Sequence, residues 1–261
     1  PNAKSVNQAL SGIKSIGMDQ GEEWVDGPEL ERLRRLKKGL KKLSIEDSDQ
    51  ATAWTFELVT KTIRHFGSGT IKLLQYHTRS VMMAAMMLRT ADIKEGRLRK
   101  TDVVWQPDGG CTIHLGDTKT VRGAFGRLHF AEEIASAALW LQLYWEAAAM
   151  EEQEDDAYLF PSIDDDGCFD WGTPMCDREF LTTTKRAAIE MGIPPEIVRK
   201  ITGHSHRSGG ATSYFLAGCD IEFIKKLGRW KSDAVLVYFR STGAAMGMMA
   251  RNVFEKLQAI L

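Results

Sequence analysis

The sequence has few cysteines, and none of them forms a paired motif. The four cysteines are Cys111, Cys168, Cys176 and Cys219, and no two stand in a Cys-x-x-Cys arrangement. Their spacing matches neither a zinc ribbon nor the disulfide framework of a small secreted protein. We therefore expect reduced thiols, as in a cytosolic or nuclear protein.

Long apolar runs and several common catalytic motifs are also missing. The most apolar stretch, Val81–Leu88, is far shorter than the roughly 20 residues that span a bilayer, and it predicts a buried helix. No secretory signal pattern opens the chain. A Gly-rich phosphate loop, a Gly-x-Ser-x-Gly elbow and a helical His-Glu-x-x-His motif are absent from the sequence.

The chain has almost no net charge, but its charges are unevenly distributed. The formal net charge is -1 over 261 residues, of which 26% are charged. Residues 151–179 hold eleven acidic side chains and one basic one, whereas residues 185–240 hold ten basic and five acidic side chains. Such runs are commonly solvated surface, and a basic third is also compatible with an anionic partner.

The hydrophobic pattern predicts a mainly α-helical protein with one small antiparallel β-sheet, an α+β class. Apolar residues recur at helical spacing over residues 54–66, 71–90 and 132–150, and again from about residue 178 to the end. Residues 102–130 instead carry β-branched and aromatic side chains broken by Asp-Gly-Gly and Gly-Asp turns. That pattern predicts two or three short strands. The acidic segment that follows residue 150 is expected to be a loop.

Six side chains spread along the chain suit one type of chemistry, the cleavage of a phosphodiester. They are Arg89, Lys119, His204, Arg207, Trp230 and Tyr238. Arginine forks bind nonbridging phosphate oxygens in two-pronged fashion and stabilise the extra charge of a five-coordinate transition state. Lysine and histidine can move protons, and an indole N–H can donate to phosphate. Tyrosine can act as the nucleophile once its proton is drawn off.

The order and spacing of these residues resemble the tyrosine recombinases, which are the phage integrase family. The matching segments, in chain order, are "LRTADI", "GDTKT", "HSHR", "LGRW" and "VLVYF". The first segment adds Asp92 to the candidate residues. Trp230 precedes Tyr238 by eight positions, one fewer than the resemblance leads us to expect. Each motif is short, but their shared order over residues 50–245 makes the match specific.

The resemblance implies an enzyme that breaks and rejoins double-stranded DNA. Tyr238 would attack the scissile phosphate and form a 3'-phosphotyrosyl link, leaving a free 5'-hydroxyl. Arg89 and Arg207 would clamp the phosphate, and Asp92 would hold Arg89 in position. Because the bond energy stays in the phosphotyrosine, the resemblance implies neither a metal ion nor another cofactor.

The resemblance assigns supporting roles to the remaining candidates. His204 and Trp230 would donate to the phosphate, and His204 could also accept the tyrosine proton. Lys119 would protonate the leaving 5'-oxygen as the general acid. Members of the family act as tetramers on two DNA duplexes, so a homo-tetramer is expected.

The resemblance also suggests a division of the chain. Residues 1–45 would be a partial helical core-binding domain, 46–51 a linker and 52–261 the catalytic domain. The stretch 251–261 has apolar side chains at helical spacing. It suits a helix that docks into a neighbouring subunit and equally a helix that packs on its own domain.

The candidate residues also have ordinary structural explanations. Arg89 could neutralise the C-terminal end of a helix dipole, and Trp230 could be a core aromatic. Tyr238 lies at the edge of an apolar helical stripe that Ser232 or Asp233 would cap, where a buried ring with an exposed hydroxyl is common.

The stretch "GHSHRSGG" raises a competing hypothesis of its own. A zinc site could use His204 and His206, but zinc needs three or four organised ligands and none cluster here. We expect His206 to point away from Arg207 as a bystander. Gly209 and Gly210 are expected to let the chain turn tightly into the next helix.

Two alternative functions remain at the level of sequence. The chain could be a mobile-element domain that binds DNA without cutting it. It could also be a type IB topoisomerase-like enzyme that relaxes DNA through the same chemistry.

Overall fold

The computed structural model describes residues 51–93, 98–117, 122–128 and 136–239. The chain divides between Gln50 and Ala51, and every described residue belongs to the second part. The predicted N-terminal domain and the predicted docking stretch 251–261 lie outside the described residues. Their assignment therefore stays a prediction.

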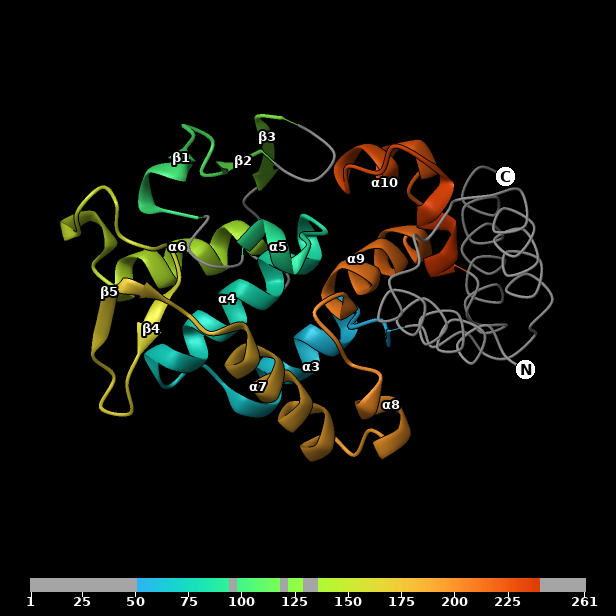
Figure 1. The fold of residues 1–261 in the computed structure, drawn as a ribbon, viewed down its shortest axis with the longest axis horizontal. Helices are drawn as coiled ribbons and strands as arrows, with labels where there is room; N and C mark the ends of the chain where they lie inside the picture. Colours follow the sequence, from blue (N-terminus) through green and yellow to red (C-terminus); the bar gives the residue numbers. More distant parts are fainter. Residues whose placement is uncertain (1–50, 94–97, 118–121, 129–135, 240–261) are drawn as a thin grey trace, which may run out of the picture. The chain divides into compact units, whose positions relative to one another are not determined.

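Helix α4 (Ile71–Ala85) lies at the centre of the described part of the chain (Figure 1). It packs against α3 (Phe56–Phe66), α6 (Ala137–Ala147) and α9 (Ser205–Leu216). All its side chains from Leu74 to Ala84 are buried, as expected for a helix surrounded by other helices. The predicted buried helix is confirmed, and it forms the middle of the hydrophobic core.

The end of α4 differs from the sequence prediction of a helix over residues 71–90. The helix ends at Ala85, and the chain turns through Met87, which has a left-handed φ of 47°. The short helix α5 (Thr90–Ile93) follows. Because the residues from Met86 to Leu88 are apolar and buried, the hydrophobic pattern runs past the true helix end. Arg89 therefore lies in the connection between two helices and not on the end of α4.

The predicted small sheet is present. Strands β1 (Val103–Trp105), β2 (Cys111–Gly116) and β3 (Ala124–Leu128) form an antiparallel sheet in that order. Cys111 pairs with Trp105 on one side and with Leu128 on the other. Lys119 belongs to the connection between β2 and β3 and lies outside the described residues.

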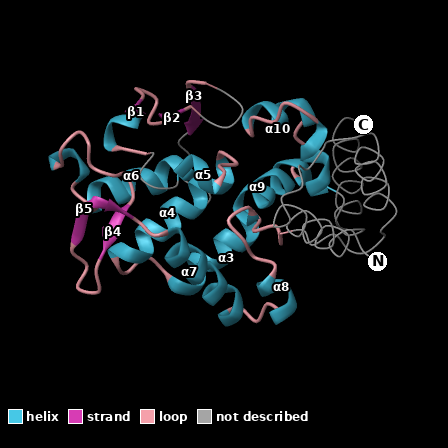
Figure 2. Cartoon of the chain, viewed as in Figure 1, coloured by secondary structure: helices cyan, strands magenta, loops and turns pink. Residues whose placement is uncertain are grey.

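A second sheet lies in the acidic segment, where the prediction of a loop was wrong (Figure 2). Strands β4 (Pro161–Ile163) and β5 (Phe169–Pro174) pair antiparallel. Asp164 starts the turn between them, because its carboxylate accepts the backbone N–H groups of Asp166 and Cys168. Aspartates here serve as turn residues, so the acidic composition concealed two short strands.

Helices resume after the second sheet, as predicted. The remaining elements are α7 (Asp177–Glu190), α8 (Pro195–Arg199), α10 (Ile221–Leu227) and the 3-10 helix η4 (Asp233–Phe239). Short 3-10 turns η2 (Lys100–Asp102) and η3 (Met150–Glu152) precede them in the chain. Across the described ranges, no helix has the length and apolar character needed to cross a membrane.

Two glycines inside α9 explain how closely its neighbours approach. A Cβ at Gly209 would lie 1.9 Å from the Trp54 carbonyl oxygen, and one at Gly210 would lie 2.1 Å from the Ala84 carbonyl oxygen. Both glycines lie within the helix, so the predicted tight turn at this point was wrong. Their role is to let α9 pack directly against the backbone of α4 and of the segment before α3.

Candidate active site

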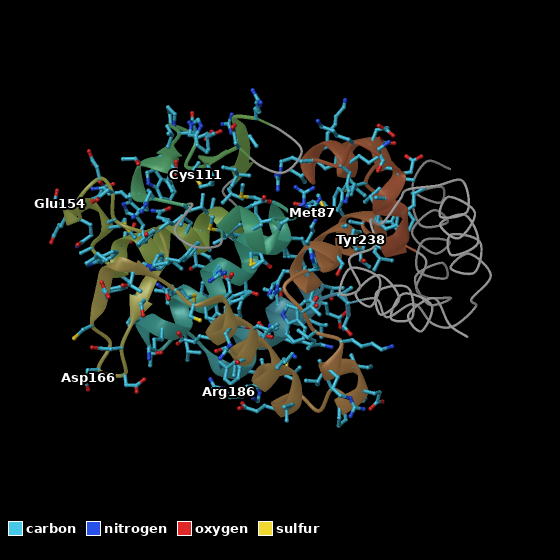
Figure 3. The ribbon with its side chains drawn as sticks, viewed as in Figure 1. Met87, Cys111, Glu154, Asp166, Arg186 and Tyr238 are labelled. Carbon is cyan, nitrogen blue, oxygen red and sulfur yellow. The ribbon has the colours of Figure 1, made fainter. Side chains whose placement is uncertain are left out.

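Three chain segments meet beside α9: the α4–α5 connection, the end of α10 and η4. Buried apolar side chains of these segments form a small cluster with Ala211 of α9; they are Met87, Ile224 and Val235. Trp230 and Tyr238 pack against this cluster. Figure 3 shows Met87 and Tyr238 near one another beside α9. Five of the predicted site residues gather here: Arg89, Asp92, Arg207, Trp230 and Tyr238.

Arg207 is the most constrained of these side chains. It projects from α9 and is only 2% exposed. Its Nη1 donates to the carbonyl oxygen of Met87, and its Nη2 donates to that of Gly228 at 2.6 Å. Its guanidinium carbon lies 3.8 Å from the centre of the Trp230 ring, which is cation–π geometry. Carbonyls and an aromatic face thus hold a buried positive charge in one orientation.

Several charged groups of the site affect the pKa of Arg207. Burial lowers the pKa of Arg207, and the positive charges of Arg89 and Arg229 lower it further. Tyr238 and Asp92 act in the opposite direction. The pKa of Arg207 is lowered to about 9, so the group still carries its charge near neutral pH. The site is therefore a cluster of positive charges that also contains a tyrosine hydroxyl and a carboxylate.

Asp92 connects two of the arginines. It is 2% exposed, and its Oδ2 accepts the backbone N–H of Arg89 at 2.9 Å. The same oxygen lies 3.4 Å from Nη2 of Arg229. Asp92 thus contacts the backbone of Arg89, and Arg229, which sequence reasoning overlooked, is one of its side-chain partners.

Tyr238 lies in the short helix η4, which packs on α9. The Tyr238 and Trp230 ring centroids are 5.8 Å apart, and both side chains are half-buried. The Tyr238 carbonyl accepts a hydrogen bond from the Thr212 hydroxyl at 3.4 Å. Next to it, Phe239 stacks on Phe215 of α9 with centroids 4.1 Å apart. These contacts hold the tyrosine against α9, while its ring stays partly open to solvent.

The two histidines of the stretch "GHSHRSGG" lie in different environments. His204 is exposed at the N-cap of α9, one turn before Arg207. His206 is buried, its Nε2 lies 2.8 Å from the Ser80 hydroxyl, and its ring contacts Trp54 and Phe180. Burial lowers the pKa of His206 to about 3. His206 is therefore a neutral core residue, and the zinc hypothesis loses the pair on which it depended.

Arg229 is the site residue that sequence analysis missed. It is 8% exposed, has a left-handed φ of 58°, and follows Gly228, the C-cap of α10. One signal was available in the sequence: Arg229 stands nine positions before Tyr238, the separation that was expected of Trp230. The burial of Arg229 and its partner could not be read from the sequence.

Comparisons with known proteins agree with this architecture. The sequence model of the phage integrase family matches residues 71–243. Among solved structures, XerA recombinase is similar with a TM-score of 0.57 at 18% identity, over 85% of this chain and 73% of that one. XerH site-specific recombinase bound to palindromic difH substrate is similar with a TM-score of 0.55 at 14% identity. The similarity covers 78% of this chain, which spans only 54% of that XerH chain. 

At these identities the solved structures show a shared fold. A comparison with curated protein sequences gave no match. The family match, by contrast, covers well over half of the chain and contains all seven predicted site residues, of which all but Lys119 lie in the described ranges. The chain belongs to the phage integrase family, the tyrosine recombinases.

Proposed function

We propose that this chain is a tyrosine-type DNA strand-exchange enzyme, a site-specific recombinase or integrase. The observation that carries the proposal is the packing beside α9: the Arg207 guanidinium lies 3.8 Å from the centre of the Trp230 ring, and that ring lies 5.8 Å from the ring of Tyr238. The charge of Arg89 also acts on the pKa of Arg207. These residues come from segments separated by as many as 149 positions in the sequence. A cluster of positive charges beside a partly exposed tyrosine suits a phosphodiester, because its phosphate is anionic and reacts with an oxygen nucleophile.

The proposed reaction is a transesterification at phosphorus. The hydroxyl oxygen of Tyr238 attacks the scissile phosphate and loses its proton, while the bond between phosphorus and the 5'-oxygen breaks. The products are a 3'-phosphotyrosyl link and a free 5'-hydroxyl. Arg89 and Arg207 neutralise the nonbridging oxygens as charge accumulates in the transition state. Attack by another 5'-hydroxyl reverses the steps and joins a new strand.

The proton transfers are assigned to Lys119 and His204. Lys119 protonates the leaving 5'-oxygen, and His204 accepts the tyrosine proton or donates to the phosphate. Trp230 supports Arg207 through its ring face, and its indole N–H is a further donor. The exchange of one phosphoester for another conserves bond energy, so the proposed reaction uses neither a metal ion nor ATP.

The proposed partner is double-stranded DNA, with four copies of the chain acting on two duplexes. Arginine and lysine contacts to phosphate release counterions, so DNA affinity should fall steeply with salt. Such a substrate places the protein in the cytoplasm or nucleus. Among the similar structures, two contain XerH bound to difH substrate, and they support DNA as the ligand class.

The test is a covalent trapping experiment with a pool of DNA sites. The protein is incubated with duplexes that carry a randomised central sequence and a nick close to it. After cleavage, the short strand next to the nick diffuses away and leaves the protein attached to DNA. Adducts are recovered under denaturing conditions, sequenced, and digested for mass spectrometry. We expect a phosphotyrosyl peptide that contains Tyr238.

Two variants complete the design. Tyr238→Phe should abolish the adduct, while Tyr158→Phe, which alters a half-buried tyrosine that packs against Arg99, should retain it. An adduct that survives in Tyr238→Phe would disprove the assigned nucleophile. DNA binding without any adduct would favour the silent DNA-binding alternative, and plasmid relaxation without recombination would favour the topoisomerase-like one.

A further inference from the structure

Arg207 and Arg229 both donate hydrogen bonds to backbone carbonyl groups at the end of α4 and at the end of α10. Arg207 donates to the carbonyl oxygens of Met87 and Gly228. Arg229 donates to those of Met86, at 3.3 Å, and of Leu227, at 3.2 Å. Each guanidinium therefore bridges the end of α4 and the end of α10, one residue apart along both segments.

The backbone is unusual at both joined segments. Met87 and Arg229 are two of the three non-glycine residues with positive φ in the described ranges, at 47° and 58°. A left-handed conformation is unfavourable for a non-glycine residue. Such conformations persist where surrounding contacts hold them in place. Here the contacts are the hydrogen bonds from the two guanidinium groups.

The pair formed by Arg229 and Asp92 is buried, with side-chain exposures of 7% and 2%. Burying two charges costs several kcal/mol per ion by desolvation, so such a pair is weak evidence for stability. The pair does fix the relative position of the two side chains, because each buried charge needs the other beside it. The Asp92 oxygen that faces Arg229 also accepts the backbone N–H of Arg89. Arg229 is thereby linked to the backbone of a proposed phosphate ligand.

We propose that Arg229 is a positioning residue that orients Arg89 through Asp92 and Arg207 through the shared backbone bridge. This inference rests on the proposed function, because it concerns how the phosphate clamp is assembled. With its charge paired to a buried carboxylate and its donors directed at carbonyls, Arg229 acts through the other two arginines. Removing the Arg229 guanidinium takes away the contacts to Met86 and Asp92 and leaves Arg207 as the remaining side-chain bridge between the α4–α5 connection and the end of α10.

Arginine is required here because of its shape. Arg229 has acceptors in three directions: the carbonyl of Leu227, the carbonyl of Met86 and the carboxylate of Asp92. A planar fork can serve all three, whereas a lysine ammonium is a compact point charge on a flexible stem. Arg229→Lys therefore keeps the positive charge but cannot donate to all three acceptors.

The first measurement tests the bridge without any DNA. Hydrogen exchange with mass spectrometry is compared for the wild type and Arg229→Lys over the peptide that covers residues 86–92. We expect exchange in that peptide to be about tenfold faster in the variant, because local opening is less opposed. Arg186→Lys, at an exposed arginine of α7, serves as the control. Unchanged exchange in Arg229→Lys would overturn the inference.

The second measurement tests the phosphate clamp. Single-turnover cleavage is followed on a trapped site, both with the normal phosphate and with a methylphosphonate at the scissile position. We expect Arg229→Lys to cleave the normal site about 100-fold more slowly, as for a small misplacement of catalytic groups. The defect should shrink to less than about tenfold on the methylphosphonate, because that group lacks the charge that the clamp neutralises. An equal defect on both substrates would show a general folding role and refute the proposal.

A double variant provides a second test in case Arg229→Lys does not fold. In Asp92→Asn with Arg229→Gln, both buried charges are removed together, which proteins often tolerate. We expect this variant to fold and still show the larger defect on the normal phosphate. If the double variant cleaves the normal phosphate at the wild-type rate, the proposal is refuted. Absence of any wild-type adduct would instead disprove the proposed function, and hydrogen exchange would still decide the role of Arg229.

Discussion

Gly209→Ala is the substitution on which sequence and structure give opposite expectations. Gly209 lies inside α9, and alanine is favoured over glycine in a helix interior by about 1 kcal/mol. Helix propensity alone therefore predicts a more stable protein. In the structure, however, the new Cβ would lie 1.9 Å from the Trp54 carbonyl oxygen and 2.7 Å from the Thr55 nitrogen. Both atoms belong to the backbone and cannot rotate away.

The magnitude follows from how far the chain must move. An ordinary contact between a Cβ and an oxygen is longer than 3 Å, so α9 and the segment at Trp54 must separate by more than an ångström. That separation would also disturb the hydrogen bond from the Trp54 N–H to the Ser205 carbonyl, which is 2.8 Å long. Overpacking of this kind costs about 3 kcal/mol. After the gain of about 1 kcal/mol from helix propensity, a net loss of about 2 kcal/mol remains.

The assay is urea unfolding followed by far-UV circular dichroism. Thr182, an exposed residue of α7, provides the control, because Thr182→Ala and Thr182→Gly together measure the alanine preference where nothing clashes. We expect Thr182→Ala to be the more stable of that pair and Gly209→Ala to be less stable than the wild type. A Gly209→Ala protein as stable as the wild type would refute the close approach of α9 to Trp54.

Two further predictions concern buried charge. The pKa of His206 is lowered to about 3 by burial and by Arg79, so below pH 6.5 the unfolded chain takes up a proton that the folded one does not. This should reduce the free energy of unfolding by roughly 1.4 kcal/mol per pH unit toward pH 3, and His206→Gln should show a flatter pH dependence; equal slopes would contradict the assignment. Asp177 pairs with Arg79, whose side chain is 2% exposed, so Asp177→Asn should lower the free energy of unfolding by about 2 kcal/mol. Asp165→Asn, at the exposed pair with Lys72, should leave the free energy of unfolding nearly unchanged because solvent screens the pair, and similar losses in both variants would disprove the difference in burial.

Several features could be predicted because they depend on local pattern. Helical spacing of apolar residues indicated α3 and α4, and the alternating residues with glycine turns indicated the first sheet. The ordered motifs indicated the family, which the match over residues 71–243 confirms. Side-chain period and turn chemistry are properties of short segments, so they can be read before the chain is folded.

Other features were hidden for equally physical reasons. The end of α4 lies within an uninterrupted apolar run, so periodicity could not locate it. The second sheet was concealed because aspartates that make turns have the same composition as an acidic loop. Gly209 and Gly210 were assigned to a turn because glycine serves both turns and close helix packing, and only the neighbouring backbone distinguishes the two.

The sequence by itself determined the class of fold, the family and the side chains suited to phosphate chemistry. Only the tertiary structure decided that Arg207 and Arg229 bridge the ends of α4 and α10, and that Asp92 lies between Arg89 and Arg229. The contact from Asp92 to Arg229 joins residues 137 positions apart. A contact of that kind depends on how α9 crosses α4, and that crossing depends on two glycines whose neighbours lie far away in the sequence.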